Sequence, residues 1–442
     1  MICHESDFEK LRLRHGFYID KSLFIKEWLK RANAVDVITR PHGFGKSLNL
    51  SMLKCFLSTE YAGRSDLFEG LKIWEDVNIK KQQGTYPVIH FSLASVTQTT
   101  MEECENEFQS VICNVYKHYI PLVSKSDTLN EYDKKYFFNR LNHIEHDHSL
   151  LSAEYGIEYL SRTLCKHYNK KVIILLDDYD VPMLNAICNG FKDKMAHLSE
   201  LFLLITFKSN PYIYRGILTG ITNIPTDSAL SNFDNYFLDS VTCKTYQEHF
   251  GFNEQEVSAA MNMFGRLDKE IVHWYGGHTI GEHSGFYTPK SVIRYLETGE
   301  FKTCPADFIM TELIGNKLKK NTYSLDDFLI MFFYNEKIYK RIDDFIDFDL
   351  YDRSGELLEL LWINGYITFK YIPEHKYNDP YELHITNRES YEALKEIVKS
   401  WFDFSMMNPN LLYGLSEEEI NRMNKAIHAF QVLTTLNLQP TN

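Results

Sequence analysis

A short apolar segment that leads through a turn into Gly45-Lys46-Ser47 is the feature that most constrains the fold of this chain. Residues 35–39 read as a strand, and apolar residues recur at helical spacing after Ser47. A strand followed by a loop and a helix presents backbone N–H groups and a helix N-terminus to an anion. Lys46 would then reach the β- and γ-phosphates of a nucleotide, and the Ser47 hydroxyl would ligate Mg²⁺. The pattern predicts a phosphate-binding loop.

The match to the usual phosphate-loop pattern, G-x-x-x-x-G-K-[ST], is incomplete, because Arg40 stands where the pattern has its first glycine. Gly-Lys-Ser also occurs by chance at the start of helices, so the tripeptide needs support from elsewhere in the chain. If the loop does hold a nucleotide, we expect the contact residues to be Arg40, Pro41, His42, Gly43, Phe44, Gly45, Lys46, Ser47 and Leu48.

Support comes from a second apolar segment, residues 171–176, which ends in the paired carboxylates Asp177 and Asp178. An unbroken apolar run of this length indicates a strand buried on both faces. A further strand, near 212–218, ends at Thr219. Short strands that alternate with helices predict an α/β fold with a mainly parallel sheet. Ligands of such sheets bind at the carboxyl ends of the strands, where these polar residues lie.

The same side chains meet the needs of nucleoside triphosphate chemistry. Such a site needs a carboxylate for Mg²⁺, an orienting group for water and a polar contact to the γ-phosphate. We expect Asp177 and Ser47 to hold Mg²⁺ and Asp178 to orient the water. Lys46 would stabilise the phosphate charge, and Thr219 would contact the γ-phosphate. Each feature has a structural alternative, since paired aspartates often cap helices and Thr-Gly is often only a turn. Their order along the chain is nevertheless that of a P-loop domain with an inserted strand.

The bulk properties indicate a globular protein with no membrane association. The chain has 442 residues and a net charge of −13, which disfavours nucleic acid as a partner because non-specific binding needs a basic surface. No apolar run reaches 18 residues, and the first residues lack the pattern of a signal peptide. The eight cysteines are scattered without a C-x-x-C pair, which is typical of reduced thiols, so we expect a cytoplasmic location.

After about residue 245 the pattern changes from alternating strands and helices to helices. Residues 303–403 read as short helices with one strand pair, at 366–369 and 381–385, which suits a winged-helix-like module. We therefore predict a P-loop core, a helical lid-like region, a winged-helix-like module and a helical tail, at residues 1–243, 244–300, 301–403 and 404–442 respectively.

Two clusters outside this frame have ordinary explanations. Residues 120–150 are polar and irregular and read as an inserted loop or short helices, so we interpret the histidines there as solvated residues in preference to a metal site; they are His143, His146 and His148. A basic cluster in the C-terminal half could contact DNA, but acidic neighbours favour a solvated helix face; it comprises Lys317, Lys319, Lys320, Lys337, Lys340 and Arg341.

Several motifs resemble, in order, those of the bacterial AAA-ATPase-like proteins. They are Tyr18-Ile19-Asp20-Lys21-Ser22, the loop Thr39 to Ser47, Asp177-Asp178-Tyr179-Asp180-Val181-Pro182, Ile217-Leu218-Thr219-Gly220, Phe250-Gly251-Phe252, Trp274-Tyr275-Gly276-Gly277 and Tyr287-Thr288-Pro289-Lys290-Ser291. The resemblance covers roughly residues 8–402. It implies an AAA-like P-loop ATPase core that binds ATP and Mg²⁺, followed by a helical and winged-helix extension. Such proteins often complete the site with an arginine from a neighbouring subunit, which leaves a homo-oligomer open; Arg40 and Arg215 are local candidates.

The chain departs from the family pattern at functional positions. The family loop usually reads Arg-Pro-Arg-Arg-Phe-Gly-Lys-Ser, so His42 and Gly43 replace two positive charges. The family's second acid is usually Glu, and Asp178 is one methylene shorter; a displacement of about 1 Å can lower a rate about 100-fold. The nuclease domain that many members carry is not expected, because about 40 residues follow Phe402.

We therefore predict an ATP-binding protein that acts as a Mg²⁺-dependent ATPase or an ATP-gated switch. The alternative is a non-catalytic protein that uses the same fold to bind a protein partner. A secreted effector is a further alternative, based on the acidic residues near 416–419.

Overall fold

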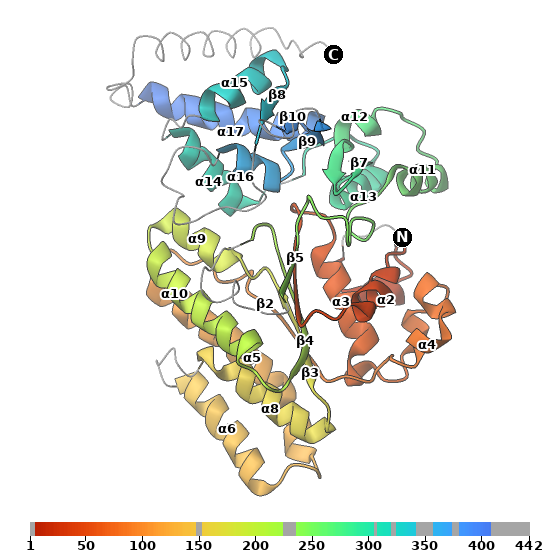
Figure 1. The fold of residues 1–442 in the computed structure, drawn as a ribbon, viewed down its shortest axis with the longest axis vertical. Coiled ribbons are helices and arrows are strands. Elements are labelled where there is room, and N and C mark those ends of the chain that lie inside the picture. Colours follow the sequence, from red (N-terminus) through yellow and green to blue (C-terminus); the bar gives the residue numbers. More distant parts are fainter. Residues whose placement is uncertain are drawn as a thin grey trace. The chain divides into compact units, whose positions relative to one another are not determined.

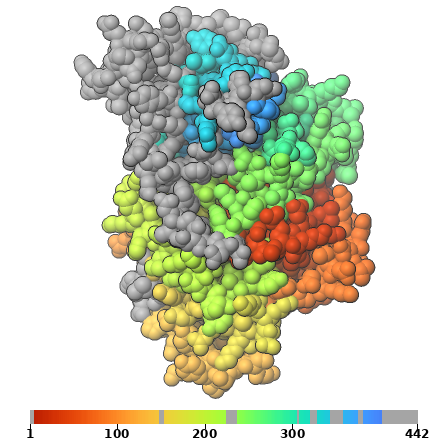
Figure 2. All heavy atoms as spheres, in the orientation of Figure 1, coloured from red at the N-terminus to blue at the C-terminus, as the bar shows by residue number. Residues whose placement is uncertain are grey.

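A computed structural model describes residues 5–146, 153–223, 236–304, 307–319, 324–341, 357–373 and 380–407 (Figure 1). The chain divides into two compact units, Met1–Phe252 and Asn253–Asn442, which are described separately. With all atoms drawn, side chains fill the spaces between the ribbons of the first unit (Figure 2). The division into four parts stays a prediction, and the helical tail predicted at 404–442 lies outside the described residues beyond Met407.

The first unit is built on a five-stranded parallel sheet with the order β2-β3-β4-β1-β5. Its strands are β1 Val35–Thr39, β2 Val88–Ser92, β3 Val172–Asp177, β4 Ile213–Gly220 and β5 Tyr236–Asp239. Every residue of β1 and β3 is buried, as expected for strands that are covered on both faces. The predicted α/β fold with a parallel sheet is confirmed. Strand β4 lies between β1, which enters the loop, and β3, which ends in Asp177.

Helices cover both faces of this sheet (Figure 1). Helix α3 packs against β2, β3 and β4 on one face, and α8 packs against β3 on the other. The helices of the first unit are α1 Phe8–Leu13, α2 Leu23–Lys30, α3 Lys46–Leu57, α4 Val77–Lys80, α5 Met101–Lys125, α6 Glu131–His146, α8 Gly156–Tyr168, α9 Val181–Asn189 and α10 Lys192–Leu203. Short 3₁₀ turns occupy Thr59–Tyr61, Ser65–Leu67 and Lys72–Glu75, and a π-helical turn, Leu204–Lys208, follows α10.

The core on the α3 face also takes in residues that follow β5. Tyr246 and Phe250 are buried and make edge-on ring contacts with Phe24 at 5.2 and 5.3 Å. The helical region predicted from residue 244 therefore begins later than expected, because residues 244–251 form turns that are anchored by those two rings. The helix, α11 Glu254–Met263, begins at a capping box in which Asn253 and Glu256 bond each other's backbone.

Of the two possibilities expected for residues 120–150, an inserted loop or short helices, the structure shows helices over most of the segment as far as residue 146. Helix α5 continues to Lys125, and α6 packs against it. The buried residues Phe137, Leu141 and Ile144 lie on one face of α6 at helical spacing. The mostly polar composition of the segment hid this narrow stripe. Among the described residues, no group of three or more His, Cys, Asp or Glu side chains is placed to hold a metal ion.

The second unit contains two small antiparallel sheets and seven helices in its described parts. Strands β6 His278–Ile280 and β7 His283–Phe286 form one sheet, and the other has the order β8-β10-β9. Helix α16 leads into the hairpin of β9 and β10, so the predicted strand pair is confirmed, while the winged helix itself stays a prediction. The remaining elements are α12 Ile271–Tyr275, α13 Pro289–Thr298, α14 Phe308–Lys319, α15 Ser324–Tyr334, β8 Ile338–Lys340, α16 Leu357–Ile363, β9 Ile367–Tyr371, β10 Tyr381–Ile385 and α17 Arg388–Met407.

The basic cluster of this unit is less exposed than its sequence indicates. The side chain of Lys317 is buried, with 1% exposed. Lys337 and Lys340 each pair with a carboxylate, at 2.7 Å from Glu382 and 2.6 Å from Asp327. These charges are neutralised within the unit, which weakens the case for a DNA-binding face. No helix among the described residues combines the length and apolar character needed to cross a bilayer.

Candidate nucleotide site

The loop between β1 and α3 has the backbone of an anion cradle. Gly43 and Gly45 have φ angles of +82° and +85°, in the left-handed region that glycine adopts without strain. Gly45 is the N-cap of α3, so the helix begins at Lys46. Left-handed residues that alternate with ordinary ones turn successive N–H groups toward one side, next to a helix N-terminus. The loop therefore suits a phosphate despite Arg40 at the first glycine position.

Lys46 lies at this loop with its side chain largely buried, at 7% exposed. Its ammonium donates hydrogen bonds to the backbone oxygens of Arg40 and Pro41, at 2.8 and 3.1 Å. These two carbonyls keep the positive charge beside the cradle. Of the other predicted contact residues, His42 is exposed, Pro41 and Phe44 are buried, and Ser47 and Leu48 are half-buried on the first turn of α3.

Asp177 and Thr219 meet at the carboxyl end of the sheet. Strand β4 pairs with both neighbours, and its register sets Thr219 beside Ile38 and Leu218 beside Leu176. The Thr219 hydroxyl donates a hydrogen bond to the Asp177 carboxylate, which is 4% exposed. Because neighbouring strands lie about 4.8 Å apart, the ends of β1 and β3 are separated by roughly 10 Å. The structure thus brings the loop, Asp177 and Thr219 to the carboxyl end of the sheet.

Asp178 is held in an unusual conformation next to Asp177. Its φ of +52° is rare for a residue with a side chain, and strain of this kind often marks functional sites. The Ser92 hydroxyl, at the end of β2, donates to its carboxylate at 3.1 Å. The contact directs the carboxylate toward β2. Sequence reasoning did not find Ser92, whose one signal is its place at the end of a strand.

Asp180 ties the end of β3 to the end of β4. One oxygen of this 1%-exposed carboxylate accepts hydrogen bonds from the backbone N–H groups of Ile221 and Thr222, at 2.7 and 2.9 Å. The other oxygen, Oδ1, is buried with no bonding partner among the described residues. A methyl group on Gly220 would lie 2.5 Å from that oxygen, so the contact requires glycine there.

Burial, reinforced by the charge of Asp178 and opposed by two backbone N–H groups and Lys46, raises the pKa of Asp180 to about 7. The folded protein therefore holds this proton more tightly than the unfolded chain, where an aspartate has a pKa near ~3.9. The contribution of the group to stability is full below about pH 4 and is lost as the pH rises through about 7.

We expect Asp180→Asn to become progressively more stable relative to wild type as the pH rises. Asparagine can accept the same two N–H bonds but never ionises. The difference in free energy of unfolding should shift by about 2 kcal/mol between pH 5 and pH 8, measured by urea denaturation. Asp180→Ala is the control, because it loses both bonds at every pH. If the stability of wild type and of Asp180→Asn changed in parallel with pH, Asp180 would be ionised in both the folded and the unfolded protein over this range, which would contradict the prediction.

The two arginines proposed as local candidates for the site are both buried in structural ion pairs. The Arg40 guanidinium pairs with Asp239 at the end of β5, and neither side chain is exposed. Arg215 pairs with Asp36 and donates to the backbone of Trp28 at the opposite end of the sheet. A role for Arg40 in nucleotide contact stays a prediction, and the visible function of its side chain is to fasten the loop to β5.

The donor set fits a magnesium nucleotide better than a protein-only metal site. Mg²⁺ prefers oxygen ligands and is usually held by one or two carboxylates together with phosphates and water. Asp177 and Ser47 supply oxygen ligands of this kind, and the loop supplies N–H groups for the phosphates. The residues at the carboxyl end of the sheet are thus chemically suited to hold a nucleotide with its metal.

A parallel sheet with the order 5-1-4-3-2, a glycine loop before α3 and polar residues at the ends of β3 and β4 define a P-loop type of nucleotide-binding fold. The profile of one protein family, described as Predicted AAA-ATPase, matches residues 5–230, just over half of the chain. The protein belongs to this AAA-ATPase-like family, as its motifs predicted. Comparison with curated proteins found no match.

Proposed function

We propose that this protein binds ATP with Mg²⁺ at the carboxyl end of the first-unit sheet, and that it acts as an ATPase or an ATP-gated switch. The observation that carries the proposal is the convergence of the Lys46 loop with the Asp177–Thr219 pair at one end of three adjacent strands. Membership of a family of predicted ATPases supports the same ligand class.

Each residue of the site has a distinct role in this proposal. The loop N–H groups and the Lys46 ammonium bind the phosphates and offset their negative charge. Ser47 and Asp177 hold Mg²⁺, which neutralises charge that develops on the phosphate oxygens. Thr219, which lies on β4 between the loop strand and β3, would donate to the γ-phosphate once its bond to Asp177 rearranges. Asp178 orients the attacking water.

Isothermal titration of the full chain with ATP, with and without Mg²⁺, tests the proposal directly. We expect one ATP per chain and tighter binding with Mg²⁺. Absence of any heat or thermal stabilisation at millimolar ATP or ADP would overturn it. We also propose a cytoplasmic location and either a homo-oligomer or a protein partner. Nucleic acid is not favoured as a partner.

A non-catalytic protein that uses the same fold to bind a protein partner is the second candidate, and one observation favours it. Asp178 is one methylene shorter than the family's glutamate, and the Ser92 hydroxyl binds its carboxylate at 3.1 Å. Binding would then change the conformation of the chain or its affinity for a partner, with turnover contributing little.

We expect Asp178→Glu to increase kcat for ATP hydrolysis by about 10- to 100-fold, because the added methylene extends the carboxylate by about 1 Å or more. Steady-state phosphate release is the measurement. Asp178→Asn serves as control, since it keeps the size and loses the base. ATP affinity should change little in both variants. A wild-type kcat that already exceeds that of Asp178→Glu would show that aspartate orients the water well in this chain.

A further inference from the structure

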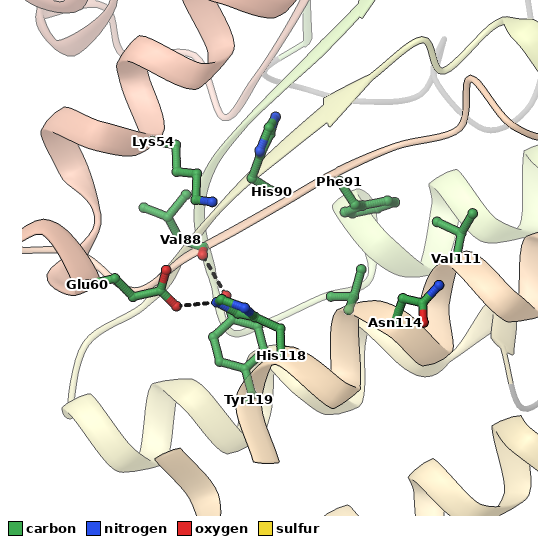
Figure 3. A pocket seen from close by; sticks show the side chains of 10 residues that line it. Lys54, Glu60, Val88, His90, Phe91, Val111, Asn114, His118 and Tyr119 are labelled. Carbon is green, nitrogen blue, oxygen red and sulfur yellow. Dashed lines mark hydrogen bonds and ion pairs between the residues drawn. The ribbon is translucent and has the colours of Figure 1, made fainter. Parts of the chain in front are cut away.

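A cavity lies in the first unit, between helix α5, the edge strand β2 and the last turn of α3 (Figure 3). Its volume of about 320 Å³ is at the lower end of the range for small-molecule sites. One face of α5 forms a wall, with lining residues at positions 111, 114, 115 and 118. The Tyr119 hydroxyl donates to the Val88 backbone at 2.7 Å and fixes α5 to the strand. The cavity is therefore bounded by a helix and a strand that are bonded to each other.

Two polar side chains in this cavity lack a bonding partner among the described residues. Lys54 contributes an ammonium whose one described contact is the ring of Tyr61, 5.9 Å away. His90 contributes an imidazole from β2 with no described hydrogen bond. Burial, followed by the charge of Lys54, lowers the pKa of His90 to about 4, so the ring is neutral at pH 7. A neutral imidazole still has one N–H donor to offer.

The other charged groups of the lining face each other. His118 and Glu60 form a pair at 2.7 Å, and that bond raises the pKa of the histidine, against burial and the charge of Lys54. Glu60 is engaged in this pair, whereas the Lys54 ammonium has no ion-pair partner among the described residues. The rest of the lining is largely apolar, with Phe91 from β2 and Val111 and Val115 from α5. The Lys54 ammonium beside apolar side chains suits an anion that carries a small hydrophobic group.

We propose that this cavity binds a small organic anion, with its carboxylate or phosphate group at Lys54 and His90 and its apolar part against Phe91 and the two valines. Lys54 supplies the charge, and His90 supplies a directed N–H. The site is separate from the phosphate loop, because Lys54 lies eight residues beyond Lys46 on α3 and faces β2 and α5. The proposal does not depend on ATP binding.

Benzoate and phenyl phosphate are suitable probes, and benzyl alcohol is their uncharged counterpart. Titration is performed on the full chain carrying Lys46→Ala, so that the phosphate loop does not contribute to the signal. We expect one benzoate or phenyl phosphate per chain, with benzyl alcohol at least about tenfold weaker. The tighter of the two anions identifies the preferred head group. Lys54→Gln should weaken binding at least about tenfold, whereas Lys125→Gln, on the exposed end of α5, should not.

Val111→Trp provides a test that leaves every charge in place. The indole should fill the cavity and abolish binding, while the circular dichroism spectrum and thermal midpoint report whether the fold is intact. His90→Gln keeps a donor and should retain part of the affinity. No binding of either anion at about 10 mM would overturn the proposal. So would binding that survives both Lys54→Gln and Val111→Trp.

Discussion

Lys46→Ala is expected to weaken ATP binding about 100-fold, equivalent to about 3 kcal/mol. The substitution removes the ammonium that the carbonyls of Arg40 and Pro41 hold beside the loop. A charge-assisted contact to phosphate in a partly buried site is worth more than an ordinary hydrogen bond, and the alanine side chain replaces none of it. Isothermal titration with Mg²⁺ and ATP measures the loss.

Two comparisons separate lost charge from lost structure. Lys125→Ala removes an equal charge from an exposed position on α5 and should leave ATP affinity unchanged. Lys46→Arg keeps the charge but cannot reproduce the compact ammonium in the loop, so an intermediate affinity is expected. If Lys46→Ala binds ATP as wild type does while its thermal midpoint is unchanged, the nucleotide does not occupy this loop.

The parts of the fold that sequence predicts well are those in which one local signal dominates. Strand β3 is an uninterrupted apolar run, and the loop after β1 contains left-handed glycines. Both could therefore be placed from the local sequence pattern. Strand β5 was missed, because Tyr236–Asp239 is only half-buried for most of its length and gains its place by pairing with β1. Helix α6 could not be distinguished from a loop, because its narrow apolar stripe lies among polar residues.

The candidate site shows the same division. Lys46, Asp177 and Thr219 follow strands, and the order of these strands in a parallel sheet determines that their ends meet. Ser92 and Asp180 act through contacts that join segments far apart in sequence, so no local pattern assigns them. Arg40 shows a different limit: its position in the loop predicts a ligand contact, which stays a prediction, but no local pattern reveals that its side chain pairs with Asp239 at the end of β5.

Arg40→Met is expected to destabilise the protein by about 3–5 kcal/mol. The guanidinium donates to the Asp239 carboxylate and to the backbone oxygens of Asp239 and Ser240, with both side chains fully buried. Removing it leaves a buried carboxylate without its partner. Burial already raises the pKa of Asp239, with Arg40 acting against that shift. The variant should raise this pKa further, so its loss of stability should be larger at pH 8 than at pH 6.

A matched surface pair and a double variant test this interpretation by urea denaturation. Arg64 pairs with Glu9 and Asp66 at a partly exposed position, so Arg64→Met should cost much less stability than Arg40→Met. Arg40→Met combined with Asp239→Leu should recover most of the stability, because well-packed apolar residues can replace a buried ion pair. ATP affinity of this double variant then separates the two roles of Arg40. Retained affinity means that the guanidinium only fastens the loop, whereas a loss in a stably folded protein means that it also contacts the nucleotide.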